Sequence, residues 1–478
     1  MKKRIRSEKN KLIERAKTLI IALLFLLCLL LGYRILQLYK TQTNVDRALW
    51  GGVSGGAEVL ENSDNLKLAV VCDSPEPQLM TLNSYSARGF INADSQIFRD
   101  ISSLVNQMLT EMYGAKSENL ISATLEDWQR TLNGDSVYIK YPLVRYVDTD
   151  IAFCEMKSSN VQGEISEFRE IIVAYDQSEE GTVTLYAADK NSDVFVKTKI
   201  MSDAAREFKE KIKKLDVGDK KDLVFAWELN LDEKSEKNKT VLDSMLLLSA
   251  EDLETHTLSV TVPKLYKSGL NFTGTTDLTL ALVNVFNYNP NTIRRYVNSD
   301  NSIMFVGETG SLNLHPEGVI EYKALDSDDG VALSSAEGLD GIFLGLGGMI
   351  EKILRISGIN TANADFRLKM TSVPQTYRFD EKCEFELDYF VGDKKVELSD
   401  ECSIRAVVQK GNLVELKMHL KDIKMQNREE TMDRIFDAID EFCEKNPEDR
   451  KIDDAYGVYV CREDGEDIKA EWRIEGAR

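Results

Sequence analysis

Histidines are the first residues to consider as metal ligands or general bases, and this 478-residue sequence has three, His256, His315 and His419. They lie far apart, and neither an HExxH motif nor cysteine pairs at zinc-site spacing accompany them. Zinc-dependent hydrolysis therefore has little support. We interpret each histidine as a surface or strand residue and predict neither a metal ion nor a cofactor.

A serine in a catalytic motif is the second candidate. Residues 52–56 read GVSGG and match the Gly-x-Ser-x-Gly pattern around Ser54. In hydrolases this serine lies on a sharp turn between a strand and a helix. The glycine-rich sequence around it predicts neither element. We therefore do not expect Ser54 to be a nucleophile.

An acidic loop is the third candidate. Residues 326–330 read DSDDG, and Glu337 follows eleven residues after Asp326. Oxygen ligands at such spacing can bind calcium, but here the glycine is fifth and Val331 sixth, the reverse of an EF-hand loop. We interpret this loop as a solvated acidic turn. No catalytic residue and no enzymatic activity are predicted for the chain.

The composition favours a globular chain with an acidic surface. The sequence has 60 Lys and Arg against 80 Asp and Glu, a formal charge of -20, with 43% hydrophobic residues and 8 Pro. Such acidity argues against nucleic acid as a partner, because a phosphate backbone requires a basic surface. The length allows two or three domains.

A membrane anchor is predicted near the N-terminus. Residues 18–39 include thirteen uninterrupted apolar residues from Leu19 to Leu31, and as a helix they can cross a bilayer. The tail before them, 1–17, carries eight basic and two acidic residues. The positive-inside rule then places this tail in the cytoplasm and the remainder of the chain outside. The predicted location is the cell membrane, with a single span.

A cleaved signal peptide is the alternative interpretation. Gly32, Tyr33 and Arg34 follow the apolar run without a small-x-small cleavage pattern, which favours the uncleaved anchor. Cys28 lies one helical turn before Gly32, and such small residues let another helix approach closely.

The part outside the membrane is predicted to have the α+β class, with antiparallel sheets flanked by helices. Residues 40–65 are polar and glycine-rich and form a linker. The predicted domains are 66–258, 259–330 and 331–478. In the first, apolar periodicity predicts a strand from 66, a helix from 95, strands between 137 and 200, a helix over 202–215 and a strand from 222.

The second half shows a helix followed by strands three times over. The helices are predicted over 278–286, 338–356 and from 431. Because the strands alternate apolar and polar residues, we expect one face of the sheet to be covered by helices and the other to be wet. Inside the helix over 338–356, Gly341, Gly345, Gly347 and Gly348 predict close packing against a neighbour.

Six of the seven cysteines lie outside the predicted span. Cys383 and Cys402 are symmetric about Gly392 and Asp393, so a tight hairpin there would set them opposite each other. That pair is of the hydrogen-bonded, wider kind, which disfavours a disulfide. Buried free thiols are the default interpretation.

Residues 284–323 resemble the YycH family of membrane-anchored regulators. The family pattern has a helix ending in Phe, a turn, a paired Arg, a strand, and a short Gly-led strand ending in Glu-Tyr. The matching residues are Phe286, Pro290, Arg294, Arg295, Phe305, Gly318, Glu321 and Tyr322. Further on, the hairpin at Gly392 and the ending with Trp472 are similar to the strands that YycH and YycI share. The likeness covers about residues 278–478, and Lys395-Val396 replaces the usual Pro-Val.

The resemblance implies regulation. Such proteins associate with an essential sensor histidine kinase of the WalK type (YycG) and modulate a two-component system that controls cell-wall metabolism. Expected partners are that kinase, the lipid bilayer and a second YycH-like or YycI-like single-span protein. The helix face expected to contact the kinase consists of Leu24, Cys28, Gly32 and Ile35. An anchored cell-wall enzyme and a passive surface scaffold remain as alternatives.

Overall fold

A computed structural model gives the fold of the following residues: 70–71, 74–85, 87–176, 178–189, 193–215, 223–229, 241–249, 253–266, 277–289, 292–333, 338–398, 401–446, 451–462 and 467–476. All of these residues belong to one unit, Lys67–Arg478. The predicted tail, membrane helix and linker, residues 1–65, lie outside the described residues. Among the described helices, none has the length and apolar character needed to cross a membrane. The proposed boundaries at 258 and 330 stay a prediction.

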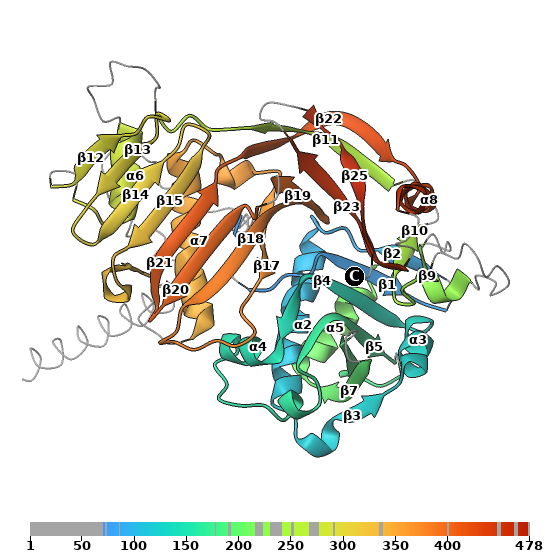
Figure 1. The fold of residues 1–478 in the computed structure, drawn as a ribbon. Helices are drawn as coiled ribbons and strands as arrows, with labels where there is room; N and C mark the ends of the chain where they lie inside the picture. Colours follow the sequence, from blue (N-terminus) through green and yellow to red (C-terminus); the bar gives the residue numbers. More distant parts are fainter. Residues whose placement is uncertain are drawn as a thin grey trace, which may run out of the picture. The chain divides into compact units, whose positions relative to one another are not determined.

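The first part of this unit is built on a seven-stranded antiparallel sheet of order β2-β1-β4-β5-β6-β7-β3 (Figure 1). Its strands are β1 (Leu79–Asn83), β2 (Arg88–Phe90), β3 (Ile121–Ala123), β4 (Ser136–Tyr146), β5 (Glu167–Tyr175), β6 (Thr182–Asp189) and β7 (Val194–Met201). Its helices are α2 (Gln96–Tyr113), α3 (Leu125–Leu132), α4 (Val147–Phe153) and α5 (Asp203–Ile212). The predicted helices from 95 and over 202–215 are confirmed.

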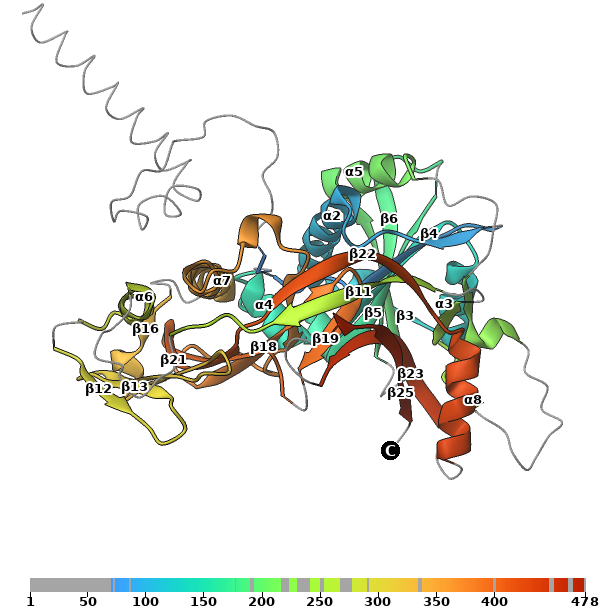
Figure 2. The same cartoon turned by 90° about the horizontal axis from the view of Figure 1, so that it is seen from above.

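Both faces of this sheet are buried. Val137 and Ile139 of β4 join the core that also contains the buried side chains of α2 and α5. Tyr138, between them, points to the opposite face and packs in a second core with Trp128 of α3. Figure 2 shows α2 and α5 next to each other, in agreement with their contacts. Strand β4 therefore buries apolar side chains on both sides of the sheet.

The second part contains a larger sheet whose main order is β12-β13-β14-β15-β21-β20-β18-β19-β23-β25. Its strands are β12 (Arg294–Val297), β13 (Ile303–Val306), β14 (Gly310–Leu314), β15 (Val319–Ala324), β16 (Val331–Ala332), β17 (Arg367–Ser372), β18 (Cys383–Val391), β19 (Lys394–Leu398), β20 (Ile404–Gln409), β21 (Asn412–His419), β23 (Lys451–Cys461) and β25 (Ala470–Gly476), with β9 (Val241–Leu242) beside β23. The three predicted helices are confirmed as α6 (Asp277–Val285), α7 (Leu339–Ile356) and α8 (Ile435–Lys445).

Helices cover one face of this sheet. Phe343 of α7 packs edge-on against Phe385 of β18, with ring centroids 4.7 Å apart. Phe286, directly after α6, packs on Tyr322 of β15. The α+β class is confirmed. Alternating burial, with one wet face, is present in β14, β15 and β21, whereas the second half of β18 is buried on both sides. Two strand pairings in the described residues differ from the antiparallel prediction, because β19 and β9 both lie parallel to β23.

The glycines of α7 pack closely, as predicted, at Gly345. A Cβ atom there would lie 2.2 Å from the carbonyl oxygen of Leu333. At Gly347 the same atom would make an ordinary contact with Val71, and at Gly348 it would meet nothing within 4 Å. The close approach of the Leu333 backbone therefore explains Gly345, whereas Gly348 has room for a side chain.

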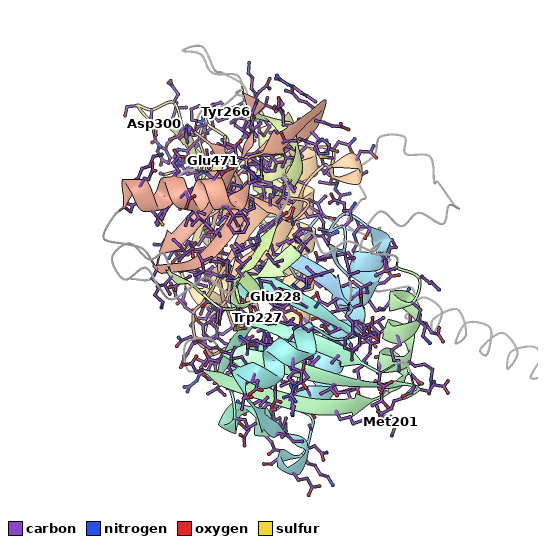
Figure 3. All side chains as sticks on the ribbon, turned by 90° about the vertical axis from the view of Figure 1, so that its right-hand side faces the viewer. Met201, Trp227, Glu228, Tyr266, Asp300 and Glu471 are labelled. Atoms are coloured by element: carbon purple, nitrogen blue, oxygen red, sulfur yellow. The ribbon has the colours of Figure 1, made fainter. Side chains whose placement is uncertain are left out.

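The strand predicted from residue 222 is shorter than expected. In the described residues β8 (Leu223–Phe225) pairs with β10 (Leu247–Ser249), and Ala226–Leu229 then form a 3-10 turn, where Figure 3 labels Trp227 and Glu228. The reason is Glu228, whose carboxylate accepts from the Phe225 N–H at 2.8 Å and pairs with buried Arg88. These contacts turn the chain back on itself.

A narrow three-stranded sheet completes the described fold. Its strands are β22 (Asp422–Met432), β11 (Leu253–Thr261) and β24 (Asp467–Ile468), in that order. β22 follows β21 after only two residues, so the chain passes directly from the larger sheet into this one.

Candidate interaction surface

The candidate functional site is the uncovered face of strands β14, β15, β21 and β20, which we call the open face. Its residues stand in rows across the strands. One row consists of Asn313, Glu321, Lys417 and Arg405. The next begins with Ser311 and continues through Lys323 and Glu415. Positive and negative side chains are thus mixed across a surface turned away from α6 and α7, which suits recognition of a charged protein partner.

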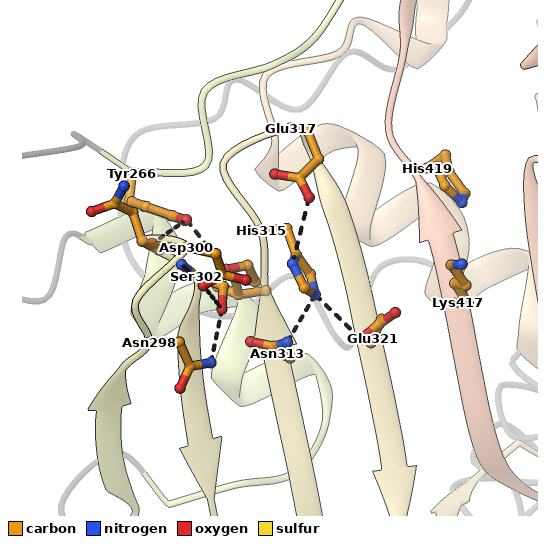
Figure 4. Close-up of polar contacts among 12 residues, drawn as sticks. Tyr266, Asn298, Asp300, Ser302, Asn313, His315, Glu317, Glu321, Lys417 and His419 are labelled. Carbon is orange, nitrogen blue, oxygen red and sulfur yellow. Dashed lines mark hydrogen bonds and ion pairs between the residues drawn. The ribbon is translucent and has the colours of Figure 1, made fainter. Parts of the chain in front are cut away.

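A histidine lies at the end of β14 (Figure 4). The His315 Nε2 atom is 3.2 Å from Glu321 Oε2 and 2.8 Å from Asn313 Nδ2. Its Nδ1 atom is 3.6 Å from Glu317 Oε1. Within the described residues no group of three or more His, Cys, Asp and Glu side chains is arranged to hold a metal ion. His315 therefore lies in a hydrogen-bonded cluster at the surface.

A second histidine occupies the same end of the open face. His419 ends β21 and pairs with Val319, whose carbonyl accepts from the His315 N–H. The His419 Nε2 atom is 3.1 Å from Glu401 Oε2, and Lys417 Nζ binds the same carboxylate oxygen. The third histidine, His256, is in β11. The interpretation of the histidines as strand or surface residues is confirmed.

His419 predicts a pH dependence of stability. Burial lowers its pKa below the ordinary value of 6.5, and the charge of Lys417 acts in the same direction. The folded chain therefore binds this proton less readily than the unfolded chain, so the free energy of unfolding falls as the pH drops through 6.5. We expect His419→Gln to lose less stability than the parent chain between about pH 7.5 and about pH 5.5.

Equilibrium unfolding at both pH values measures this difference. The window stays above the range in which Glu401 protonates, because its hydrogen bond from Lys417 lowers the pKa of that carboxyl. An identical loss of stability in the parent chain and in His419→Gln would contradict the prediction.

Residues of the family-like pattern meet in the larger sheet. Phe286 and Tyr322 stack with ring centroids 4.8 Å apart and planes at 26°. Burial raises the pKa of Tyr322 to about 12, so its hydroxyl stays neutral. Glu321, next to it, points to the open face and contacts His315. Gly318 precedes β15 with a φ of +78°, which favours glycine.

The paired arginines lie within a strand. Arg294 and Arg295 are the first residues of β12, opposite Val306 and Phe305 of β13. Because Phe305 is buried, Arg295 shares the core side of the strand, while Arg294 shares the open face. The pattern placed this pair before a strand, and the structure begins the strand with it.

The predicted hairpin at Gly392 is present. This residue has a φ of +61°, and the register pairs Val391 with Lys394 across the turn. The arrangement expected for Cys383 and Cys402 is wrong, however. The start of β18 pairs with β20, so Cys383 faces Val408, and both cysteines are free thiols. The default interpretation as thiols is confirmed for these two.

Trp472 lies on the last strand, β25. Its indole N–H donates to the carbonyl of Asp433 at 2.7 Å, and its ring packs against the small core formed by α8 and neighbouring strands. Its position is that of a structural residue. The residues Leu24, Cys28, Gly32 and Ile35, expected to contact the kinase, lie outside the described residues.

A buried ion cluster was not found by sequence reasoning. Asp454 of β23 accepts from Lys140 of β4 and lies 3.1 Å from Arg169 Nη1 of β5. Its side chain is 8% exposed. The cluster joins strands of the two large sheets, and its members are separated by 314 and 285 residues in sequence. No local signal marks such a set.

The comparisons with known proteins give one related structure. It is the crystal structure of YycH from Bacillus subtilis, with 10% sequence identity, a TM-score of 0.46, and coverage of 84% of this chain and 94% of that chain. No family description matches the sequence. No curated protein matches it either.

Proposed function

We propose that this chain is a single-pass membrane regulator that associates with a sensor histidine kinase of the WalK type. In this role it modulates a two-component system that controls cell-wall metabolism, with its N-terminus in the cytoplasm and most of the chain outside. A second YycH-like or YycI-like protein is a further proposed partner.

The observation that carries the proposal is the joint placement of the residues that resemble the YycH family. Phe286 and Tyr322 stack and join the end of α6 to β15. Glu321 lies on the open face beside them, and Gly392 turns β18 into β19. A chance resemblance would not require matched residues that are distant in sequence to contact each other, as Phe286 and Tyr322 do. This supports the family assignment from which the regulatory role is taken.

The geometry of the open face supports a binding role. Its charged side chains contact one another in pairs, such as Lys417 with Glu401 and Arg405 with Glu384. Exposed pairs of this kind contribute little to stability, typically below about 1 kcal/mol. They can exchange partners when another charged surface approaches, which gives specificity more than affinity.

The proposed route to the kinase is through the membrane. Lipid gives no hydrophobic incentive for helix association, so packing of small residues would hold the span against the kinase's own spans. The outer part would then favour one arrangement of the kinase by making different contacts with its two states.

In-membrane photocrosslinking tests this proposal. A photoreactive residue at Leu24 or Gly32 in the native host is expected to capture a sensor histidine kinase. Leu26 and Leu30 are the matched controls, because at 100° per residue they lie on the opposite side of the predicted helix. Kinase adducts from 24 and 32 but not from 26 and 30 would support the proposed face. Capture of lipid alone from all four positions would reject the membrane route.

A further inference from the structure

The feature that goes beyond this role is β12, an outermost strand of the larger sheet. In the described part of the chain it pairs on one side, with β13. Tyr296 and Val297 are 49% and 59% exposed. Edge strands are usually blunted by charges or covered, because their free N–H and C=O groups can bind another strand. Exposed apolar side chains on such an edge indicate a docking site.

The hydrogen-bond pattern fixes which groups point outward. The Asn298 N–H donates to the Ser302 carbonyl at 2.9 Å, so this pair is of the hydrogen-bonded kind. Hydrogen-bonded and non-hydrogen-bonded pairs alternate along antiparallel strands. Tyr296 therefore bonds toward β13, whereas the N–H and C=O of Val297 point away from it.

Opposite charges stand on the two sides of Tyr296. Arg294 is exposed and makes no hydrogen bond or ion pair with another described residue. Asp300 lies in the turn after β12, where its carboxylate accepts from the Ser302 N–H at 2.9 Å (Figure 4). This hydrogen bond lowers the pKa of Asp300, so the carboxylate stays charged. With a positive charge before Tyr296 and a negative charge after it, this segment is complementary in charge to an antiparallel second copy of itself.

We propose that β12 binds β12 of a second copy of this chain in an antiparallel pair centred on Tyr296. In this register each Tyr296 faces its counterpart, and each Val297 faces residue 295 of the other copy. Each Arg294 then lies beside the turn that carries Asp300 of the other copy. A shift of one residue pair toward the N-terminus would oppose the two copies of Arg295, which disfavours that register. The contact is isologous, so it closes at two copies.

A cysteine at the centre of the pair tests the proposal. Residues that face each other without hydrogen bonds have the closer side chains, with Cα atoms about 4.5 Å apart, within disulfide reach. We expect mild oxidation of full-length Tyr296→Cys in isolated host membranes to give a disulfide between two copies of residue 296, identified by peptide mass spectrometry. Met201→Cys is the collision control, because Met201 is 81% exposed and is remote from Asp300 in Figure 3.

Two further substitutions separate specific pairing from chance encounter. Val297→Pro removes one outward N–H per copy, and it is expected to reduce the 296–296 disulfide roughly tenfold, whereas Val297→Thr keeps it. Arg294→Glu turns attraction to Asp300 into repulsion and is expected to reduce the disulfide severalfold. Lys323→Glu, with the same charge change on the open face three strands away, is expected to leave it unchanged.

The result that would overturn the proposal is equally direct. A Tyr296→Cys yield no higher than that of Met201→Cys would reject pairing at this edge. Persistence of the disulfide in both Val297→Pro and Arg294→Glu would also reject it. Neither result bears on the kinase, which the photocrosslinks at residues 24 and 32 test separately.

Discussion

Replacing Asp454 by alanine is expected to lower the free energy of unfolding by about 3–5 kcal/mol. This carboxylate is nearly buried and holds Lys140 and Arg169 from two strands of the other large sheet. Removing it leaves two cations close together without their counter-charge. Lys140 is the more costly of the two, because its side chain is 12% exposed against 31% for Arg169.

The neighbouring residue provides the matched control. Asp453 is 43% exposed and contacts Lys451 at 3.5 Å, so Asp453→Ala is expected to change stability by less than about 1 kcal/mol. Denaturant unfolding of both variants measures the difference. Equal stability of the two would mean that the Asp454 cluster does not hold the sheets together.

Removing one charge of the cluster is expected to cost more stability than replacing all three charged residues by apolar ones. A triple variant with Asp454→Leu, Lys140→Met and Arg169→Met removes all three charges and keeps apolar volume. It is expected to be much more stable than Asp454→Ala, because replacing a whole buried ion set can be nearly neutral. A triple variant as unstable as the single one would show that packing, rather than unpaired charge, explains the loss.

Phe286→Ala is the second large effect, with an expected loss of about 3–5 kcal/mol. Phe286 is 2% exposed and stacks on Tyr322. The substitution leaves a cavity between the end of α6 and β15, and it removes an aromatic pair that itself contributes about 0.5–1.5 kcal/mol.

Phe90→Ala is the control for this substitution, since the same atoms are removed where the ring is 42% exposed. Its expected cost is about 1 kcal/mol or less. Thermal or denaturant unfolding distinguishes the two variants. If Phe286→Ala were no more destabilising than Phe90→Ala, the aromatic pair would not be part of the stable core.

Local patterns predicted many of the elements. Helix α2 follows from its apolar spacing and from Ser95, whose side chain caps the Phe98 N–H. The turn at Gly392 follows from the need for a positive φ. Helix α3 was missed although a signal was visible, because Thr124 and Asp127 form a capping box directly before Trp128.

Pairings between distant strands could not be predicted in the same way. The alternation of apolar and polar residues along β15 and β21 indicates that each strand has a wet face. No local pattern indicates that the two strands are neighbours, and the open face forms because they pair. The error at Cys383 has the same origin, since β18 pairs with β20 along its first half and with β19 only near its end. The cluster at Asp454 further depends on a register irregularity in β23 between Ile452 and Asp454.

The position of β23 and β25 has a consequence for the order of assembly during synthesis. These strands follow the other strands of the larger sheet in sequence, yet β23 lies parallel to β19 and supplies the counter-charge for Lys140 and Arg169. Lys140 and Arg169 are synthesised 314 and 285 residues before Asp454, and until then both cations lack this counter-charge. The cluster can therefore form only after Asp454 has been synthesised. A product that stops short of residue 451 leaves the edge of β19 without β23 and leaves Lys140 and Arg169 without the Asp454 carboxylate.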